Sequence, residues 1–250
     1  MAEWTWASAR RRGTSHIKSG TPCQDAVLSA TVRDGGRLLG IVSDGAGSAA
    51  HGGPGAFITT RTMVEVLLAQ TPSSVDLPTD DDIWSGLDAA RDRIGLAAAS
   101  RGLSPRDFAA TMVLAIADSD GAVLALVGDG AAAVRTDGVW SVPSWPENGE
   151  YASTTYFVTD EPQARMRIVR LQKAPDAIVL MSDGLERLAL DFAAQTPHHP
   201  FFETMVKPVE TSVTVGRDQR LSQTLANYLG RDAVNARTDD DKSLLIAVRR

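Results

Sequence analysis

Short apolar runs recur along the chain and predict buried strands. Each run is a few residues long and rich in Val, Ile and Leu, which is typical of strands that are buried on at least one face. Longer segments between them carry apolar residues at helical spacing instead. The pattern predicts strands at Leu38–Val42, Met112–Ala117, Val123–Val127, Ile178–Met181 and Leu244–Val248, and helices at Gly55–Leu68, Asp81–Ala99, Gly184–Ala194 and Arg220–Leu229.

The connections between these runs indicate an antiparallel arrangement. Asp-Gly pairs at 120–121 and 137–138 separate consecutive strand-like runs, and both residue types tolerate the positive φ of a tight hairpin turn. We interpret Asp34-Gly35 as a turn for the same reason. Since groups of strands and helices follow one another, we expect an α+β fold with helices layered outside antiparallel sheet. Two long segments show neither the apolar runs of strands nor the spacing of helices, so we expect irregular binding loops there. They are Val142–Asp160 and Thr196–Pro208.

Composition narrows the class of protein. The 250 residues are 43% hydrophobic and 22% charged, which is ordinary for a folded chain, and we expect a single domain over residues 1–250. The net charge of −6 argues against nucleic acid and anionic membranes as partners. A single cysteine, Cys23, excludes an intramolecular disulfide and a thiolate zinc site. With no apolar stretch of membrane-spanning length, we expect a cytoplasmic protein.

Two Asp-Gly pairs do not fit the hairpin interpretation. Asp44-Gly45 and Asp183-Gly184 each follow an apolar run and a serine, and each leads into small or helix-forming residues instead of a second strand. This arrangement places a carboxylate at the end of a buried strand. Asp129, in LALVGDGAAAV, also follows an apolar run, but its local sequence is the weakest indication of a ligand in this set.

A run of three acidic residues, Asp239, Asp240 and Asp241, directly precedes the last predicted strand. Such a run is usually a solvated surface, but carboxylates at the mouth of a buried strand repel one another unless a cation compensates them. Together with the Asp-Gly pairs they offer oxygen ligands only. Oxygen ligands suit Mg²⁺ or Mn²⁺ better than zinc.

These motifs, taken in order, resemble the metal-dependent protein phosphatases of the protein phosphatase 2C family, in particular its small stand-alone bacterial branch. Each motif is weak alone, but their order and spacing together are specific. The resemblance implies an antiparallel β-sandwich flanked by α-helices on both sides. The motifs are GTSHIKSGTPCQDA (13–26), SDGAGSAAHGGPGA (43–56), RDFAATMV (106–113), GDG (128–130), GEYASTTYFVTDE (149–161), SDGLERLAL (182–190), PHHPFF (197–202) and RTDDDKSLLIAV (237–248).

The resemblance assigns roles to the acidic residues. It implies that two Mn²⁺ or Mg²⁺ ions share an activated water, and a pair of such ions orients that water and offsets charge on a phosphoryl group. Asp239 and Asp241 remain alternatives to Asp240. The implied roles are Asp44 as the bridging ligand, the carbonyl of Gly45 as a second ligand, Asp183 and Asp240 as ligands of the other ion, Asp25 as a contact through water, and Asp129 with Asp183 as the site of a possible third ion.

Besides Gln24, where the family often has Glu, two departures from the family pattern matter. Ala46 stands where some members have a histidine that acts as general acid, so His51 or a metal-bound water would have to protonate the leaving group. Gly20 stands where the family has an arginine that grips the phosphate. The nearest substitutes are His16 and Lys18, and we expect His16 to take part in catalysis as well as in phosphate binding.

The resemblance implies a serine/threonine protein phosphatase that hydrolyses phosphoserine and phosphothreonine monoesters. Its partners would be phosphorylated proteins, for instance substrates of a bacterial serine/threonine kinase, and we expect a monomer. Ala46 and Gly20 favour an alternative, a catalytically weak regulatory module that binds a phosphoprotein. A second alternative is a haloacid-dehalogenase motif at Ala115–Gly121, with Asp118 as a covalent nucleophile, although that segment fits a hairpin better. The aromatic segment Ser144–Asp160 either covers the site or is an ordinary surface loop.

Overall fold

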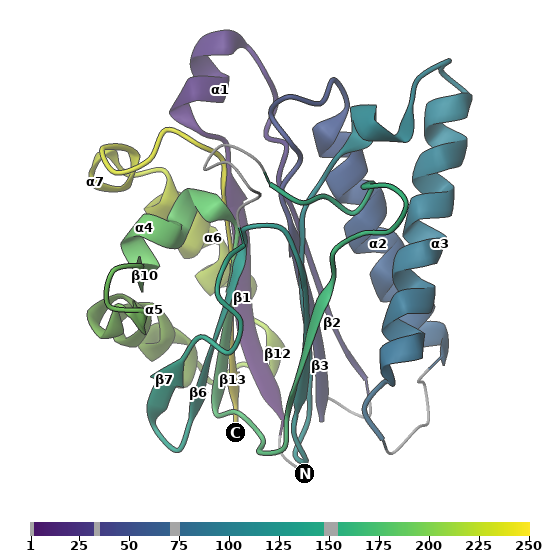
Figure 1. Cartoon of the computed structure of the whole chain (residues 1–250). Coiled ribbons are helices and arrows are strands. Elements are labelled where there is room, and N and C mark those ends of the chain that lie inside the picture. Colours follow the sequence, from purple (N-terminus) through teal and green to yellow (C-terminus); the bar gives the residue numbers. More distant parts are fainter. Residues whose placement is uncertain (1–2, 33–35, 71–75, 148–154) are drawn as a thin grey trace.

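Two β-sheets stack face to face, and helices cover both outer faces of the stack (Figure 1). The computed structural model describes residues 3–32, 36–70, 76–147 and 155–250. The layers, from one side to the other, are a helix pair, a sheet, a second sheet and further helices. The expected α+β sandwich flanked by helices is therefore confirmed.

The first sheet has the strand order β12-β1-β13-β9-β6-β7 and the second the order β2-β3-β4-β5-β8. All neighbours are antiparallel except β1 and β12, which pair in parallel. A small separate ribbon joins β10 to β11. The strand bounds are β1 (Trp4–Arg11), β2 (Ala26–Val32), β3 (Arg37–Ser43), β4 (Met112–Ala117), β5 (Ala122–Val127), β6 (Ala131–Thr136), β7 (Val139–Ser141), β8 (Arg167–Leu171), β9 (Ala177–Met181), β10 (Leu190–Asp191), β11 (Thr196–Pro197), β12 (Gly216–Arg217) and β13 (Lys242–Arg249).

The longest helices form the outer layers. Helices α2 and α3 pack on the second sheet, while α5 and α6 pack on the first (Figure 1). Across the described ranges, no helix is both long enough and apolar enough to cross a bilayer. The helix bounds are α1 (Thr14–Ser19), α2 (Gly52–Gln70), α3 (Asp80–Ala99), α4 (Glu186–Ala189), α5 (His199–Glu210), α6 (Gln219–Leu229) and α7 (Asp232–Asn235), with 3-10 turns η1 (Pro105–Phe108) and η2 (Asp183–Leu185).

The central strands are apolar on both faces because each face is buried. In β3, Leu38 and Val42 point into the core between the two sheets, while Leu39 and Ile41 point toward α2 and α3. This period of two follows from the alternation of side chains along a strand. The continuous apolar runs in the sequence therefore indicated strands covered on both sides.

Two predictions about local structure were wrong. Thr196–Pro208 is not irregular, because α5 begins at His199 and buries Phe201 and Phe202 against the first sheet. Pro200 and Pro208 hid this helix, but a proline in the first turn loses no hydrogen bond. Gly184–Ala194 is not one helix either. Helix α4 ends at Ala189, and the next residue pairs as a strand with β11.

The hairpin predictions are confirmed where the structure describes them. Strands β4 and β5 are antiparallel around the 120–121 turn, and β6 and β7 are antiparallel around the 137–138 turn. Asp137 and Gly138 adopt φ values of 51° and 75°, the positive angles that a tight hairpin turn requires. The Asp34-Gly35 turn lies outside the described residues.

The strand register brings distant acidic residues to one edge of the sandwich. Met181, at the end of β9, is paired with Leu244 on one side and with Ala131 on the other. The residues just after β9 therefore lie beside the residues just before β13 and β6. In the second sheet, Ser43 at the end of β3 is paired with Ala26 at the start of β2 in the same way.

Candidate active site

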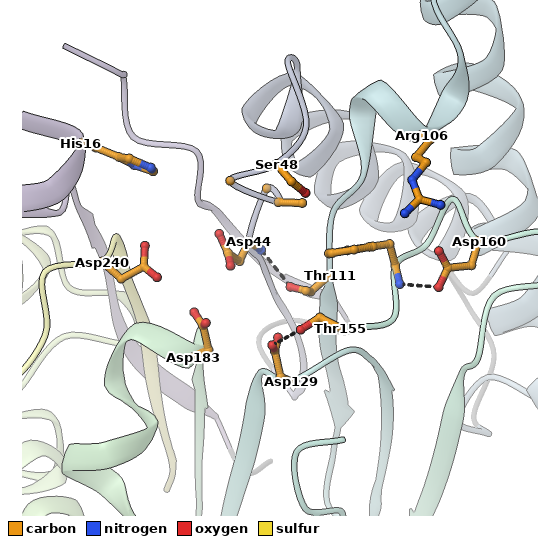
Figure 2. A pocket seen from close by; sticks show the side chains of 14 residues that line it. His16, Asp44, Ser48, Arg106, Thr111, Asp129, Thr155, Asp160, Asp183 and Asp240 are labelled. Atoms are coloured by element: carbon orange, nitrogen blue, oxygen red, sulfur yellow. Dashed lines mark hydrogen bonds between the residues drawn. The ribbon is translucent and has the colours of Figure 1, made fainter. Parts of the chain in front are cut away.

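A cavity of about 440 Å³ lies at this edge, between the ends of the two sheets. Five carboxylates line it, and Figure 2 shows four of them, Asp44, Asp129, Asp183 and Asp240, projecting toward a common space. Its lining consists of His16, Asp44, Gly45, Ala46, Gly47, Ser48, Arg106, Thr111, Asp129, Thr155, Phe157, Asp160, Asp183 and Asp240.

Asp44 is held by backbone pairing that continues beyond β3. Its N–H donates to the Thr111 hydroxyl at 3.0 Å, and its carbonyl accepts from the Thr111 N–H at 2.8 Å. The N–H of Ala46 donates to the Ala109 carbonyl at 2.9 Å. Gly45 lies between them, and a Cβ there would come within 2.2 Å of the Gly52 carbonyl carbon, so only glycine fits. Asp44 and the Gly45 carbonyl are consequently fixed at the cavity.

Asp25 lies buried behind the cavity lining. One of its carboxylate oxygens accepts from the Ser182 hydroxyl at 2.9 Å. Burial raises the pKa of Asp25 to about 6. The pKa of Asp44 is raised well above its usual value, first by burial and then by the negative charges of Asp25 and Asp183. These carboxylates therefore destabilise one another's charged forms.

Asp183 and Asp129 lie on the side of the cavity formed by the first sheet. Burial raises the pKa of Asp183 to about 8, and the charges of Asp129 and Asp240 add to this effect. Burial also raises the pKa of Asp129, while a hydrogen bond from the Thr155 hydroxyl opposes the rise. Burial next to Asp129 raises the pKa of Glu186 to about 7. The acidic cluster therefore extends from Asp44 to Glu186.

The three consecutive aspartates before β13 occupy different environments. Asp240 lines the cavity, and one of its oxygens accepts from the Asp241 N–H at 2.8 Å. Asp241 is buried and points away from the cavity, where its carboxylate accepts the N–H groups of Gly13 and Gln24, each at 2.6 Å. Asp239 is exposed. The geometry therefore favours Asp240 over its neighbours as a cavity ligand.

The sequence analysis named His16, Lys18 and His51 as candidate proton donors or phosphate ligands. Of these three, only His16 lines the cavity. Its Nδ1 atom lies 2.9 Å from Oδ2 of Asp241, the distance of an ion pair, although the alignment is not that of a hydrogen bond. Lys18 is exposed and does not line the cavity. His51 stacks on Phe108 with ring centroids 5.0 Å apart, outside the cavity lining. Gly20 ends α1 with a φ of 76°.

Sequence reasoning missed Arg106, Ser48 and Thr111, which line the cavity from loops and a strand edge. Their motifs were recognised, RDFAATMV among them, but nothing in the spacing showed that these side chains face the carboxylates. The segment Ser144–Asp160 contributes Thr155, Phe157 and Asp160 to the lining. Tyr151 in that segment lies outside the described residues.

The structure excludes Asp118 as a covalent nucleophile. Asp118 is 2% exposed and accepts from Nε and Nη2 of the buried Arg37 at 3.0 and 2.8 Å. It follows the last residue of β4 in the hairpin to β5, and it does not line the cavity that holds Asp44 and Asp183. Burial raises the pKa of the Cys23 thiol to about 12, which disfavours the thiolate that a cysteine nucleophile requires.

The donor set of the cavity fits divalent cations with a preference for oxygen. Asp183 Oδ1 is buried and has no hydrogen-bond partner in the described part of the chain, and the neighbouring carboxylates repel it. Across the described ranges, no three His, Cys, Asp or Glu side chains form a ready-made cage for one ion. Mg²⁺ commonly binds through one or two carboxylates and completes its shell with water, so this spread arrangement suits it.

Comparisons with known proteins show the family of this chain. A family model described as protein phosphatase 2C matches residues 12–230. Serine/threonine-protein phosphatase 3 of Escherichia coli (strain K12) is 33% identical over 250 residues, which cover 98% of each chain. The chain belongs to the protein phosphatase 2C family.

Solved structures share the fold at low sequence identity. PppA, a key regulatory component of T6SS in Pseudomonas aeruginosa, matches with a TM-score of 0.69 at 19% identity, over 100% of both chains. The catalytic domain of serine threonine protein phosphatase PstP, solved in complex with two manganese ions, matches with a TM-score of 0.67 at 14% identity, over 100% of this chain and 99% of that one.

The class of enzyme follows from the family. The chain is a serine/threonine protein phosphatase, a phosphoric monoester hydrolase of a family that works by a two-metal mechanism. The regulatory-module alternative is not favoured, because the full-length relative is named as a phosphatase and the carboxylates that the family resemblance requires are present.

Proposed function

We propose that this protein removes phosphoryl groups from phosphoserine and phosphothreonine residues of protein substrates, with Mn²⁺ or Mg²⁺ held at the carboxylate cavity. The observation that supports this most directly is the convergence of Asp44, Asp183 and Asp240 on one cavity. The pKa values of Asp44 and Asp183 are raised by burial and mutual repulsion, so cations there would stabilise the folded state.

We propose that Asp44 and the Gly45 carbonyl hold the ions from the second sheet, and that Asp183 and Asp240 hold them from the first. Asp129 is the candidate for a third ion, and it accepts a hydrogen bond from the Thr155 hydroxyl, another residue of the cavity lining. Asp25 supports Asp44 from behind. When bound, a pair of divalent cations lowers the pKa of water and offsets charge on the phosphoryl oxygens.

His16 is our candidate for the general acid. It lines the cavity, and its Nδ1 side faces the buried carboxylate of Asp241. That contact leaves Nε2 as the ring atom available to the cavity, where it would donate a proton to the serine or threonine alkoxide that leaves. Ala46 cannot perform this role, and His51 lies outside the cavity lining.

Hydrolysis of p-nitrophenyl phosphate and of a phosphothreonine peptide, each with Mn²⁺, Mg²⁺ or EDTA, tests this function. We expect metal-dependent turnover that Asp44→Asn and Asp183→Asn reduce by about 10³-fold or more, since metal stabilisation of transition-state charge is worth several kcal/mol. Asp88→Asn, an exposed aspartate on α3, is the control and should retain full turnover. Absence of turnover in the wild type, despite Mn²⁺ binding by calorimetry, would favour the phosphoprotein-binding module.

A further inference from the structure

Arg106 lines the carboxylate cavity without a partner of its own. In the described part of the chain, its guanidinium forms no hydrogen bond and no ion pair. Three other arginines of the described chain donate to backbone carbonyls instead: Arg12 to the His16 carbonyl, Arg91 to the Asp160 carbonyl, and Arg167 to the Gly128 carbonyl. An arginine left free beside five carboxylates has donors available for a ligand.

The backbone that carries Arg106 is held firmly. Ser104 and Asp107 cap η1 reciprocally, with the Ser104 N–H and hydroxyl both donating to the Asp107 carboxylate at 2.9 Å. A Cβ at Gly55 would come within 1.9 Å of the Phe108 carbonyl oxygen, so η1 packs directly against the start of α2. Capping and packing therefore fix the backbone position from which the exposed Arg106 side chain extends.

A guanidinium suits the charge of the cavity and of the proposed substrate. A phosphate monoester is a dianion near neutral pH, and the lining of the cavity is strongly acidic. Among the described residues of that lining, Arg106 is the only arginine or lysine, and its planar fork of donors matches phosphoryl oxygens. Figure 2 shows it on the side of the cavity opposite His16 and Asp240.

We propose that Arg106 binds the phosphoryl group of the substrate, an inference that rests on the proposed phosphatase function. It supplies from η1 the guanidinium that Gly20 cannot supply from the end of α1. Arg106 also borders a second cavity of about 630 Å³, which it shares with Arg165, Tyr156 and Ser104. Arg106 therefore lies between the cavity proposed for the phosphoryl group and the second cavity. The second cavity is large enough for substrate residues that flank the phosphorylated side chain.

Arg106→Ala and Arg106→Lys test this role, with Arg165→Ala as the matched control. Arg165 lines only the second of these two cavities and is held by Glu147 and Tyr156. The measurements are calorimetric titration of the Mn²⁺-loaded protein with inorganic phosphate, and KM for p-nitrophenyl phosphate and for a phosphothreonine peptide. Thermal unfolding verifies that each variant is folded, which we expect because Arg106 is exposed.

We expect Arg106→Ala to weaken phosphate binding and to raise both KM values by about 10- to 100-fold, since hydrogen bonds to charged groups are among the strongest. Arg106→Lys should recover part of this loss, and Arg165→Ala should leave phosphate affinity within about two-fold of the wild type. Unchanged phosphate affinity in Arg106→Ala would overturn the assignment, as would an effect confined to the peptide. Absence of turnover in the wild-type protein would instead contradict the proposed function. The phosphate titration would still decide the role of Arg106 in that case.

Discussion

Nδ1 of His16 lies 2.9 Å from Oδ2 of Asp241, so a residue of α1 and a residue next to β13 meet at the edge of the cavity. The same carboxylate accepts the N–H groups of Gly13 and Gln24. Asp241 therefore ties the segments on both sides of α1 to the mouth of the last strand. A run of three aspartates thus contains one candidate metal ligand, one structural anchor and one exposed residue.

His16→Gln should impair substrates according to how much their leaving groups need a proton. We expect turnover of the phosphothreonine peptide to fall by about 10²-fold or more, while p-nitrophenyl phosphate, whose leaving group departs without protonation, loses far less. The ratio of kcat for the two substrates measures this effect. His51→Gln is the control, because that ring stacks on Phe108 outside the cavity lining, and it should leave the ratio unchanged. An equal loss on both substrates in His16→Gln would contradict the general-acid role.

Asp241→Asn should destabilise the fold. The amide would present a donor to backbone N–H donors in a buried site, so we expect the free energy of unfolding to fall by about 2–3 kcal/mol. Urea denaturation monitored by circular dichroism measures the change. Asp239→Asn, at the exposed neighbouring position, should change the stability by less than about 0.5 kcal/mol. Equal stability of the two variants would show that Asp241 is not an anchor.

The metal-free protein should lose stability as the pH rises. Asp25 and Asp183 have folded-state pKa values of about 6 and about 8, above the ordinary carboxyl value, so the folded state holds protons that the unfolded state releases. Stability is then greatest below the ordinary carboxyl pKa and falls as the pH rises through these raised values. Thermal unfolding in EDTA from about pH 5.5 to about pH 8.5 should show this decline, on the order of 1–3 kcal/mol.

Asp183→Asn should flatten that decline, because it removes the carboxylate whose pKa is raised to about 8. Added Mn²⁺ should stabilise the wild type most at high pH, where the carboxylates are ionised, and should stabilise Asp183→Asn less. If stability in EDTA falls equally steeply with pH in the wild type and in Asp183→Asn, the Asp183 carboxylate is not the source of the pH dependence.

Asp118→Ala should lower the free energy of unfolding without changing the phosphatase reaction. The substitution removes the carboxylate that accepts two N–H groups of the buried Arg37 guanidinium. Loss of such charged, buried hydrogen bonds costs about 3 kcal/mol. We expect that loss in urea denaturation, with kcat per folded molecule unchanged at low temperature. A stable Asp118→Ala variant without phosphatase activity would revive the covalent-nucleophile alternative.

The sequence by itself determined the elements with a strong local signal. The β3 and β4 strands were visible because their apolar runs are continuous, and α2 and α3 because their apolar residues recur at helical spacing. The hairpin at Asp137-Gly138 was visible because its turn chemistry is local. The sequence also showed that Asp44 and Asp183 follow buried strands, which is why both were recognised as candidate ligands.

Tertiary structure decided what local pattern cannot encode. Asp240 and Asp241 are adjacent and chemically identical, and only the register of β13 against β9 and β1 turns one toward the cavity and the other toward Gly13 and Gln24. Arg106 lines the same cavity as the carboxylates because η1 packs on α2, a contact between segments distant in the chain. Positions along a strand or turn are local properties, but which side chains share a cavity depends on long-range packing.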